Sequence, residues 1–222
     1  MIRTFVAAAL LASTAAVPIT GIATAAAQVP QGNSAPTAAL PFVDDIPAAQ
    51  DIPYPGTIKL AVDATNTAQG IFRVKETIPV AKAGPMALLF PKWLPGKHGP
   101  RGEIEKLAGL VIRANGRVLP WRRDPVDVFA FHIDVPTNAK TLDVDFQFIS
   151  ATQGNQGRIV MTDKMVSLQP NSVSLYPAGY YTRQIPIQMT ATFPAGWTAA
   201  GAVPAKASAT SAGATYTYDT TN

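Results

Sequence analysis

Apolar and polar residues alternate along most of the chain after residue 54. In Ile58-Lys59-Leu60-Ala61-Val62-Asp63 the large apolar side chains fall on every second position, and the same spacing recurs in 129–135, 142–148 and 185–193. Successive side chains of a strand point to opposite faces. The pattern therefore predicts half-buried strands, with one face toward a core and the other toward water.

Turn signals separate these segments and keep the predicted strands short. The strongest is Asn115-Gly116, which favours a tight hairpin because both residues tolerate a positive φ. One helical turn is expected at 102–107, and no longer amphipathic helix is expected. Further strands are predicted around 70–78, 86–90, 108–113, 117–121, 158–161, 172–176 and 214–219. Many short strands with little helix predict an all-β fold, an antiparallel two-sheet β-sandwich.

The N-terminal residues have the composition of an export signal. Arg3 gives a positive start, 5–12 is an apolar stretch, and Ala25-Ala26-Ala27 fits the small-residue rule for cleavage. Pro and Gly interrupt the segment, which favours cleavage over a membrane anchor. We therefore predict a signal peptide at 1–27, a periplasmic or secreted protein, and no membrane contact after cleavage.

The next part of the chain predicts a linker and then a single domain. Residues 28–53 are rich in Pro, Ala, Gln and Asp and hold few large apolar side chains, which is typical of an extended leader. Residues 54–222 carry the alternating pattern and form the predicted β-sandwich domain. The strand pattern runs to Tyr218 and stops soon after it, so we expect one domain of a longer protein.

Composition excludes several function classes. There is no cysteine, so disulfides, thiolate metal sites, cysteine nucleophiles and a lipidated cysteine are excluded. The formal charge of +4 becomes +3 without Arg3, the one charged residue of 1–27. Basic residues are scattered, and Arg122-Arg123 is followed at once by Asp124, so no nucleic-acid partner is expected.

Metal chemistry has few candidate ligands. The chain holds two histidines, His98 and His132, and no H-E-x-x-H helix. A catalytic zinc site needs three protein ligands and an open position. His98 with Glu103 and Glu105 is a weak loop cluster, and His132 is expected to be a hydrogen-bonded strand residue. The prediction is no catalytic, metal or cofactor-binding residue in this chain.

Other hydrolytic sites are also disfavoured. No G-x-S-x-G motif occurs, so a triad of Ser172 or Ser174 with His132 has little support. Asp143 and Asp145 lie on one strand face, about 6.6–7 Å apart by the strand rise, near the spacing of inverting glycosidases. Two aspartates on an alternating strand are expected to be its solvated face. No phosphate-binding glycine motif occurs.

The most unusual stretch surrounds Trp93. A tryptophan between prolines, followed by Gly96, predicts a rigid turn that holds a large aromatic ring against a neighbour. The ring is either a core residue at a loop hinge or a platform at an interface. The same alternatives apply to Tyr180 and Tyr181.

Four ordered segments carry a family resemblance. These are Phe90–Gly96, Leu107–Ile112, Leu119–Val128 and Leu175–Gly179. Together they resemble the N-terminal domain of the glycyl aminopeptidase family (metallopeptidase family sixty-one), from about Tyr54 to the end of the chain. Its motif positions, with a structural or interface role, are Trp93, Pro95, Gly96, Trp121, Asp124, Tyr176, Pro177 and Gly179. His98 departs from the tyrosine of many relatives.

The resemblance implies that catalysis belongs to a different domain from this one. Members are exported zinc aminopeptidases in which a β-rich N-terminal domain precedes a thermolysin-like catalytic domain with H-E-x-x-H. The zinc and the catalytic residues are expected in that domain, which is absent from this chain. The expected function is a non-catalytic scaffold and substrate-cleft wall, partnered by a catalytic domain in cis, with an apolar docking patch left exposed. The alternative is a free-standing periplasmic peptide- or glycan-binding module that uses Trp93, Tyr180 and Tyr181.

Overall fold

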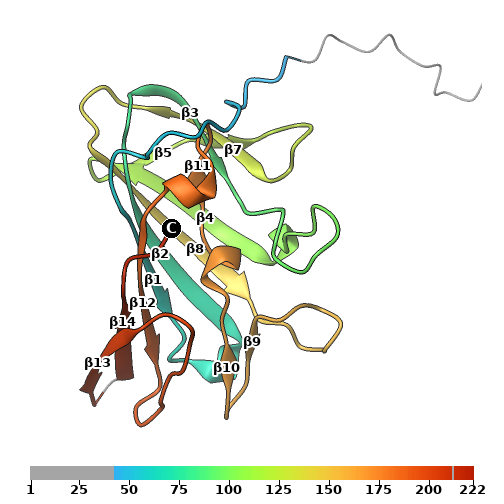
Figure 1. Cartoon of the computed structure of the whole chain (residues 1–222), viewed down its shortest axis with the longest axis vertical. Coiled ribbons are helices and arrows are strands. Elements are labelled where there is room, and N and C mark those ends of the chain that lie inside the picture. The colour runs from blue at the N-terminus through green and yellow to red at the C-terminus, as the bar shows by residue number, and fades with distance from the viewer. Residues whose placement is uncertain (1–42, 212) are drawn as a thin grey trace, which may run out of the picture. The chain divides into compact units, whose positions relative to one another are not determined.

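Strands form most of the regular structure in the computed structural model, which describes residues 43–211 and 213–222 (Figure 1). The predicted signal peptide 1–27 lies outside the described residues. The strands are β1 (Ile58–Asp63), β2 (Ile71–Pro79), β3 (Gly84–Leu89), β4 (Leu107–Ala114), β5 (Arg117–Leu119), β6 (Trp121–Arg123), β7 (Ala130–Val135), β8 (Thr141–Ile149), β9 (Val160–Met161), β10 (Val166–Ser167), β11 (Tyr176–Pro177), β12 (Ile187–Phe193), β13 (Ala205–Thr210) and β14 (Gly213–Tyr218). The predicted all-β class is confirmed.

Helix in the described residues is limited to four 3-10 turns. They are η1 (Thr67–Gln69), η2 (Ile104–Lys106), η3 (Pro170–Ser172) and η4 (Thr182–Gln184). The turn expected at 102–107 is confirmed by η2. Within the part of the chain that the structure describes, no helix has the length and apolarity of a membrane span.

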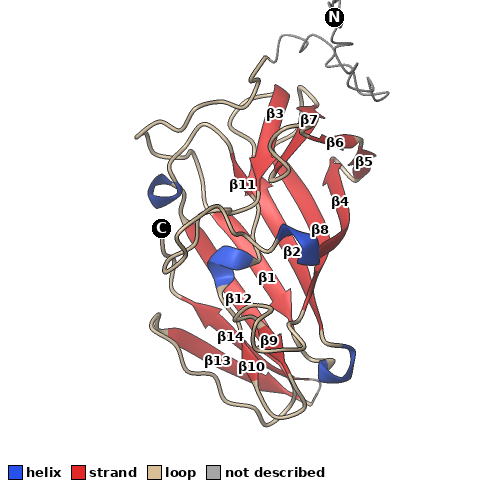
Figure 2. Cartoon of the chain, turned by 90° about the vertical axis from the view of Figure 1, so that its right-hand side faces the viewer, coloured by secondary structure: helices blue, strands red, loops and turns tan. Residues whose placement is uncertain are grey.

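The strands form a large sheet, a smaller sheet and a short hairpin (Figure 2). The large sheet has eight strands in the order β13-β14-β12-β1-β2-β8-β4-β5, and the smaller sheet has four in the order β11-β3-β7-β6. The hairpin pairs β9 with β10. All pairs within these sheets are antiparallel except β1 with β12, whose connection spans most of the domain. A parallel pair needs such a long connection, so local patterns cannot reveal it.

Turn-forming residues explain why the predicted hairpin at Asn115-Gly116 is present and why the predicted strand at 172–176 is mostly not. Asn115 and Gly116 have φ values of 51° and 74° and join β4 to β5, as the hairpin signal predicted. The strand expected at 172–176 is mostly absent. Pro170 cannot donate a backbone hydrogen bond, and it begins the 3-10 turn η3, so only Tyr176 and Pro177 pair as β11.

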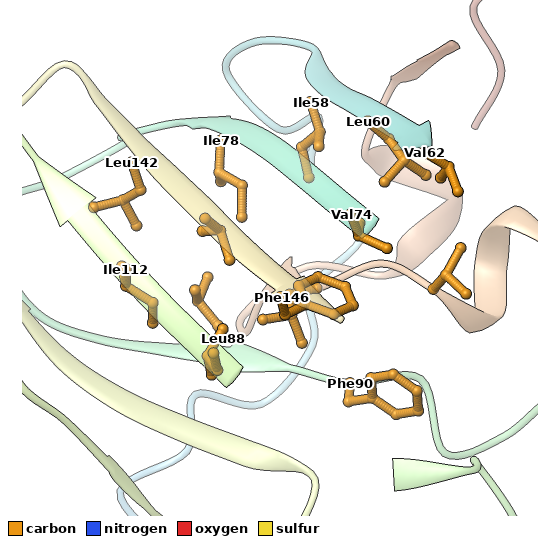
Figure 3. Close-up of a cluster of buried hydrophobic side chains, with 14 of the residues drawn as sticks. Ile58, Leu60, Val62, Val74, Ile78, Leu88, Phe90, Ile112, Leu142 and Phe146 are labelled. Carbon is orange, nitrogen blue, oxygen red and sulfur yellow. The ribbon is translucent and has the colours of Figure 1, made fainter. Parts of the chain in front are cut away.

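The hydrophobic core lies between the large and small sheets (Figure 3). From the large sheet it contains Ile58, Leu60, Val62, Val74, Ile78, Ile112, Leu142 and Phe146, and from the small sheet and its continuation it contains Leu88 and Phe90. Phe90 stacks on Phe148 of β8, with ring centroids 6.4 Å apart and planes at 10°. This stacked pair joins the two layers at the point where β3 ends.

Truncation of the stacked pair tests this packing. Phe148→Ala removes a fully buried ring and is expected to lower the free energy of unfolding by about 3–5 kcal/mol. Ile149→Ala is the matched control, because the next side chain on β8 faces outward and is 45% exposed. Urea unfolding of the full chain measures both, and equal losses in the two variants would contradict the assigned faces.

Candidate functional site

The loop that carries Trp93 begins with a tight turn. The N–H of Lys97 donates to the carbonyl of Leu94 at 3.0 Å, and Gly96 has a φ of 79°. Proline at the second position and a positive φ at the third are typical of a type II turn, so Pro95 and Gly96 have the residue types that this turn needs. The rigid turn expected from the sequence is therefore present.

The base of the same loop is closed by backbone contacts. The N–H of Gly102 donates to the carbonyl of Lys92 at 3.0 Å. A Cβ atom at Gly102 would lie 2.1 Å from the carbonyl oxygen of Pro91, so no other residue fits without moving the backbone. The loop between these contacts has a fixed shape.

Trp93 points its ring toward solvent rather than into the core. Its exposed fraction is 64%, whereas the side chain of Leu94 is buried. The interpretation of Trp93 as a core tryptophan is therefore wrong. The turn directs the smaller leucine inward and leaves the indole outside, where an exposed aromatic ring can serve as a contact residue.

A second loop with exposed apolar residues is joined to the Trp93 loop. Val126 and Val128 are 65% and 45% exposed, and Asp127 between them forms an ion pair with Lys92. The N–H of Phe90 also donates to the carbonyl of Phe129 at 2.8 Å. We call Trp93, Val126 and Val128 the Trp93 surface.

The fourth family-motif segment, Leu175–Gly179, lies beside this ion pair. Tyr176 on β11 pairs with β3, and burial, together with the charge of Asp127, raises the pKa of its hydroxyl. Pro177 is buried in the same strand. Gly179 follows with a φ of 93°, and its carbonyl accepts the N–H of Gln50 at 3.1 Å. Residues from the first and last motif segments are thus brought together, as neighbours of one salt bridge.

The motif residues Trp121 and Asp124 each make hydrogen bonds to backbone groups. The indole N–H of Trp121 donates to the carbonyl of Leu110 at 3.1 Å. Oδ1 of Asp124 accepts the N–H groups of Val126 and Asp127 at 2.8 and 2.7 Å. The pKa of Asp124 is lowered to about 2, mainly by the hydrogen bond from the Asp127 N–H. Burial opposes this shift, and Val126 and His132 add to it. Asp124 is therefore a buried cap of the turn that presents Val126.

His132 lies between two carboxylates. Its Nε2 is 2.9 Å from Oδ2 of Asp124 and 3.5 Å from Oδ1 of Asp45, and Nη2 of Arg122 is 3.1 Å from the other oxygen of Asp45. Within the described residues, Asp45, Asp124 and His132 are the group of possible metal ligands that lie close together. Their three ligand atoms are within 4.8 Å of one another. Each of these groups already has a protein partner, and the guanidinium and imidazole face the two carboxylates. The sequence could not indicate Asp45, because it lies in the predicted linker.

The loop cluster of His98 with two glutamates does not form a metal site. The carboxylate of Glu103 accepts hydrogen bonds from Lys97 at 3.0 Å and Lys106 at 2.9 Å. Burial would raise the pKa of Glu103, but the two ammonium groups outweigh it and hold the pKa below its ordinary value. Glu103 therefore links Lys97 of the Trp93 loop to Lys106 of η2.

The other weakly supported hydrolytic sites are not assembled either. Oγ of Ser172 is buried and has no hydrogen-bond partner, while Nε2 of His132 is occupied by Asp124. Asp145 pairs with Arg113, and Asp143 accepts a long hydrogen bond from Thr77 at 3.4 Å, so these aspartates form the solvated face that was expected.

A buried carboxyl group that sequence analysis missed lies in β2. The inward residues of this strand include Phe72, Val74 and Ile78, and Glu76 occupies the position between the last two with 2% exposure. Both of its oxygens accept the N–H of Leu175, at 3.0 and 3.1 Å. Burial raises the pKa of Glu76 well above its ordinary value, against a smaller opposite effect of this N–H. The interrupted alternation is the sequence signal that could have identified it.

Comparison with known proteins gives one family and several fold neighbours. The profile of the Peptidase M61 N-terminal domain matches residues 59–222. An aminopeptidase N family protein from Idiomarina loihiensis is similar in structure, with a TM-score of 0.55 and 16% identity over 72% of this chain and 27% of that chain. An M1 zinc metallopeptidase from Deinococcus radiodurans has a TM-score of 0.45 and 10% identity over 79% of this chain and 40% of that one. No curated protein matches the chain. This chain thus spans about a quarter of the first relative, and the likeness shows the fold alone.

Replacement of the buried glutamate is expected to remove a pH dependence of stability. The folded state binds the proton of Glu76 more tightly than the unfolded state does, because its pKa is raised. The stability is therefore complete at acid pH and falls as pH rises toward the folded pKa. Glu76→Gln keeps an acceptor for the Leu175 N–H and should increase the unfolding free energy at neutral pH, with no gain below about pH 4.

Urea unfolding at several pH values measures this difference. Glu105→Gln is the control, because it makes the same chemical change at an exposed position. Identical pH profiles for Glu76→Gln and the unaltered chain would show that the carboxyl is not buried as described.

Asp124 is expected to contribute in the opposite pH range. Its lowered pKa means that stability is present above the ordinary aspartate value and is lost as pH falls toward about 2. Asp124→Ala leaves the N–H groups of Val126 and Asp127 without an acceptor and should cost about 1–3 kcal/mol at pH 7. Asp134→Ala on β7 is the exposed control. Thermal unfolding between pH 2 and 7 compares them, and a loss no larger than the control's would contradict the capping role.

Proposed function

The chain belongs to the Peptidase M61 N-terminal domain family, and on this premise we propose that it is the non-catalytic β-domain of an exported zinc metallo-aminopeptidase. Its proposed role is to act as scaffold and substrate-cleft wall for a catalytic domain in cis. The family match over 59–222 supports this role, and so does the fold that the chain shares with an aminopeptidase N family protein. The composition of residues 1–27 supports export to the periplasm or beyond.

The side chains that could perform hydrolysis are used in structural contacts. Asp124 binds two backbone N–H groups and His132, Glu103 binds two lysines, and Glu76 binds the N–H of Leu175. A general base must be free to reach a substrate proton, and a zinc ligand must be free to reach the ion. We therefore expect the zinc and the catalytic base to belong to the catalytic domain.

The Trp93 surface is the observation that carries the proposal. Its tryptophan is 64% exposed and lies on a loop whose turn, base and salt bridge are all fixed by contacts within the domain. Aromatic residues on a rigid support contribute strongly to protein interfaces, because little freedom is lost when they dock. We infer that this surface contacts the catalytic domain.

A peptide- or glycan-binding module has weaker support. Tyr180 packs edge-on against Tyr54, with ring centroids 4.9 Å apart, so its ring is part of the domain. Tyr181 is 43% exposed, but the guanidinium of Arg183 lies 4.3 Å from its ring centroid. The two tyrosines therefore do not form a free stacking platform together.

Binding in trans tests the proposed interface. The proposal requires a catalytic domain with an H-E-x-x-H motif in the same reading frame, and that domain is the binding partner in this test. Titration calorimetry with the purified chain should give a 1:1 complex, and Trp93→Ala should weaken it about thirtyfold or more. Val126→Ala should weaken it severalfold. Val118→Ala is the matched control, because Val118 on β5 is 63% exposed and Val126 is 65% exposed.

Three results would contradict the proposal. One is equal affinity of the Trp93→Ala and Val118→Ala variants, which would place the interface elsewhere. Another is release of glycine from a glycyl-anilide by this chain alone, blocked by a chelator, which would show a complete zinc site within it. A reading frame that lacks the H-E-x-x-H motif would contradict the arrangement in cis.

A further inference from the structure

The two sheets of the sandwich differ in size, and this leaves part of the core face uncovered by a second sheet. Eight strands lie opposite four, and β12 and β14 are near one end of the larger sheet. There the β9–β10 hairpin and the loop 197–203 take the place of a second sheet (Figure 2). Between them and the large sheet is a hollow of about 390 Å³.

Most of the residues that line this hollow are apolar, with polar atoms among them. Met189 and Phe193 of β12 and Tyr218 of β14 contribute from the large sheet, Trp197 contributes from the loop, and Met165 lies at the exposed end of the hairpin. Methionine side chains adapt to irregular apolar ligands, and tryptophan offers a large ring face. The volume is at the lower end of the range for small-molecule sites.

The backbone that carries Trp197 on one wall is fixed by hydrogen bonds within the domain. The N–H of Trp197 donates to the carbonyl of Pro194 at 3.2 Å, in a turn where Gly196 has a φ of 80°. The hydroxyl of Tyr216 donates to the carbonyl of Trp197 at 3.1 Å. A preformed wall lowers the entropic cost of binding.

One cation completes the lining. Lys164 is the one charged residue among the side chains that surround the hollow, and no ion pair involves it within the described residues. Its turn is fixed, because Oγ1 of Thr162 accepts the N–H groups of Lys164 and Met165 at 3.3 and 2.9 Å. The N–H of Thr162 donates to the carbonyl of Met165 at 2.8 Å. An ammonium group at the edge of an apolar hollow is complementary to an amphiphile with an anionic head.

We propose that this hollow binds a medium-chain carboxylate of the fatty-acid class, with its chain against Met189, Phe193 and Trp197 and its carboxylate at Lys164. This site is independent of the proposed docking role, because the Trp93 surface lies on different loops. It requires neither a catalytic domain nor a metal ion.

Fluorescence titration with dodecanoate below its micellar concentration tests the site. In the Trp93→Phe/Trp121→Phe background Trp197 is the one remaining tryptophan, and a saturable blue shift is expected. Lys164→Ala should raise the Kd about tenfold, the loss of one contact to a charged group. Lys82→Ala, which removes an exposed lysine outside the lining, should leave the Kd unchanged.

Changes in the ligand's head group and in the charge at residue 164 test whether Lys164 binds the carboxylate. Dodecanol should bind the unaltered site about tenfold more weakly than dodecanoate, and Lys164→Glu should reverse the preference toward dodecyltrimethylammonium. Ala199→Phe fills the lining and should abolish binding while the melting temperature stays near that of the parent chain. Absence of a saturable shift, equal affinities for dodecanol and dodecanoate, or equal effects of the two lysine substitutions would overturn the proposal.

Discussion

The packing of the eight-stranded sheet on the four-stranded sheet determines where the Trp93 loop leaves the domain. Phe90 stacks on Phe148 at the boundary between the layers, and the Trp93 loop starts immediately after Phe90. Because the ring of Phe90 is fully buried, the loop leaves the domain from a fixed point. The packing of the core therefore fixes the position of the loop that carries Trp93.

Buried or half-buried acidic side chains hold the loops to this core. Asp124 holds the turn with Val126 and Val128, and Glu103 holds the Trp93 loop through Lys97. Glu76 fixes the backbone just before β11. In many enzymes such groups are arranged for proton transfer, whereas here their partners are backbone N–H groups and side chains of the same domain. These three acidic residues thus hold loop backbone and loop side chains in place.

What the sequence could reveal depended on how local each interaction is. Alternation identified β1, β8 and β12, and Asn115-Gly116 identified a hairpin, because strand faces and turn angles depend on neighbouring residues. Strand β13 gave no signal, since residues 205–209 are exposed on both faces and lack large apolar side chains. The contact of Asp45 with His132 joins residues far apart in the chain, and only the folded sheet brings them together.

The same distinction applies to the candidate surfaces. Trp93 was noticed from its prolines and glycine, but its exposure depends on Leu94 occupying the buried side of the turn, which the sequence left open. The hollow under the β9–β10 hairpin had no motif at all, because it follows from the unequal sizes of two sheets. An exposed ring on a fixed loop suits a large partner that covers it, whereas a hollow of about 390 Å³ suits a ligand that enters it. The Trp93 surface and the hollow therefore differ in the size of partner that they fit, and both follow from how the two sheets pack.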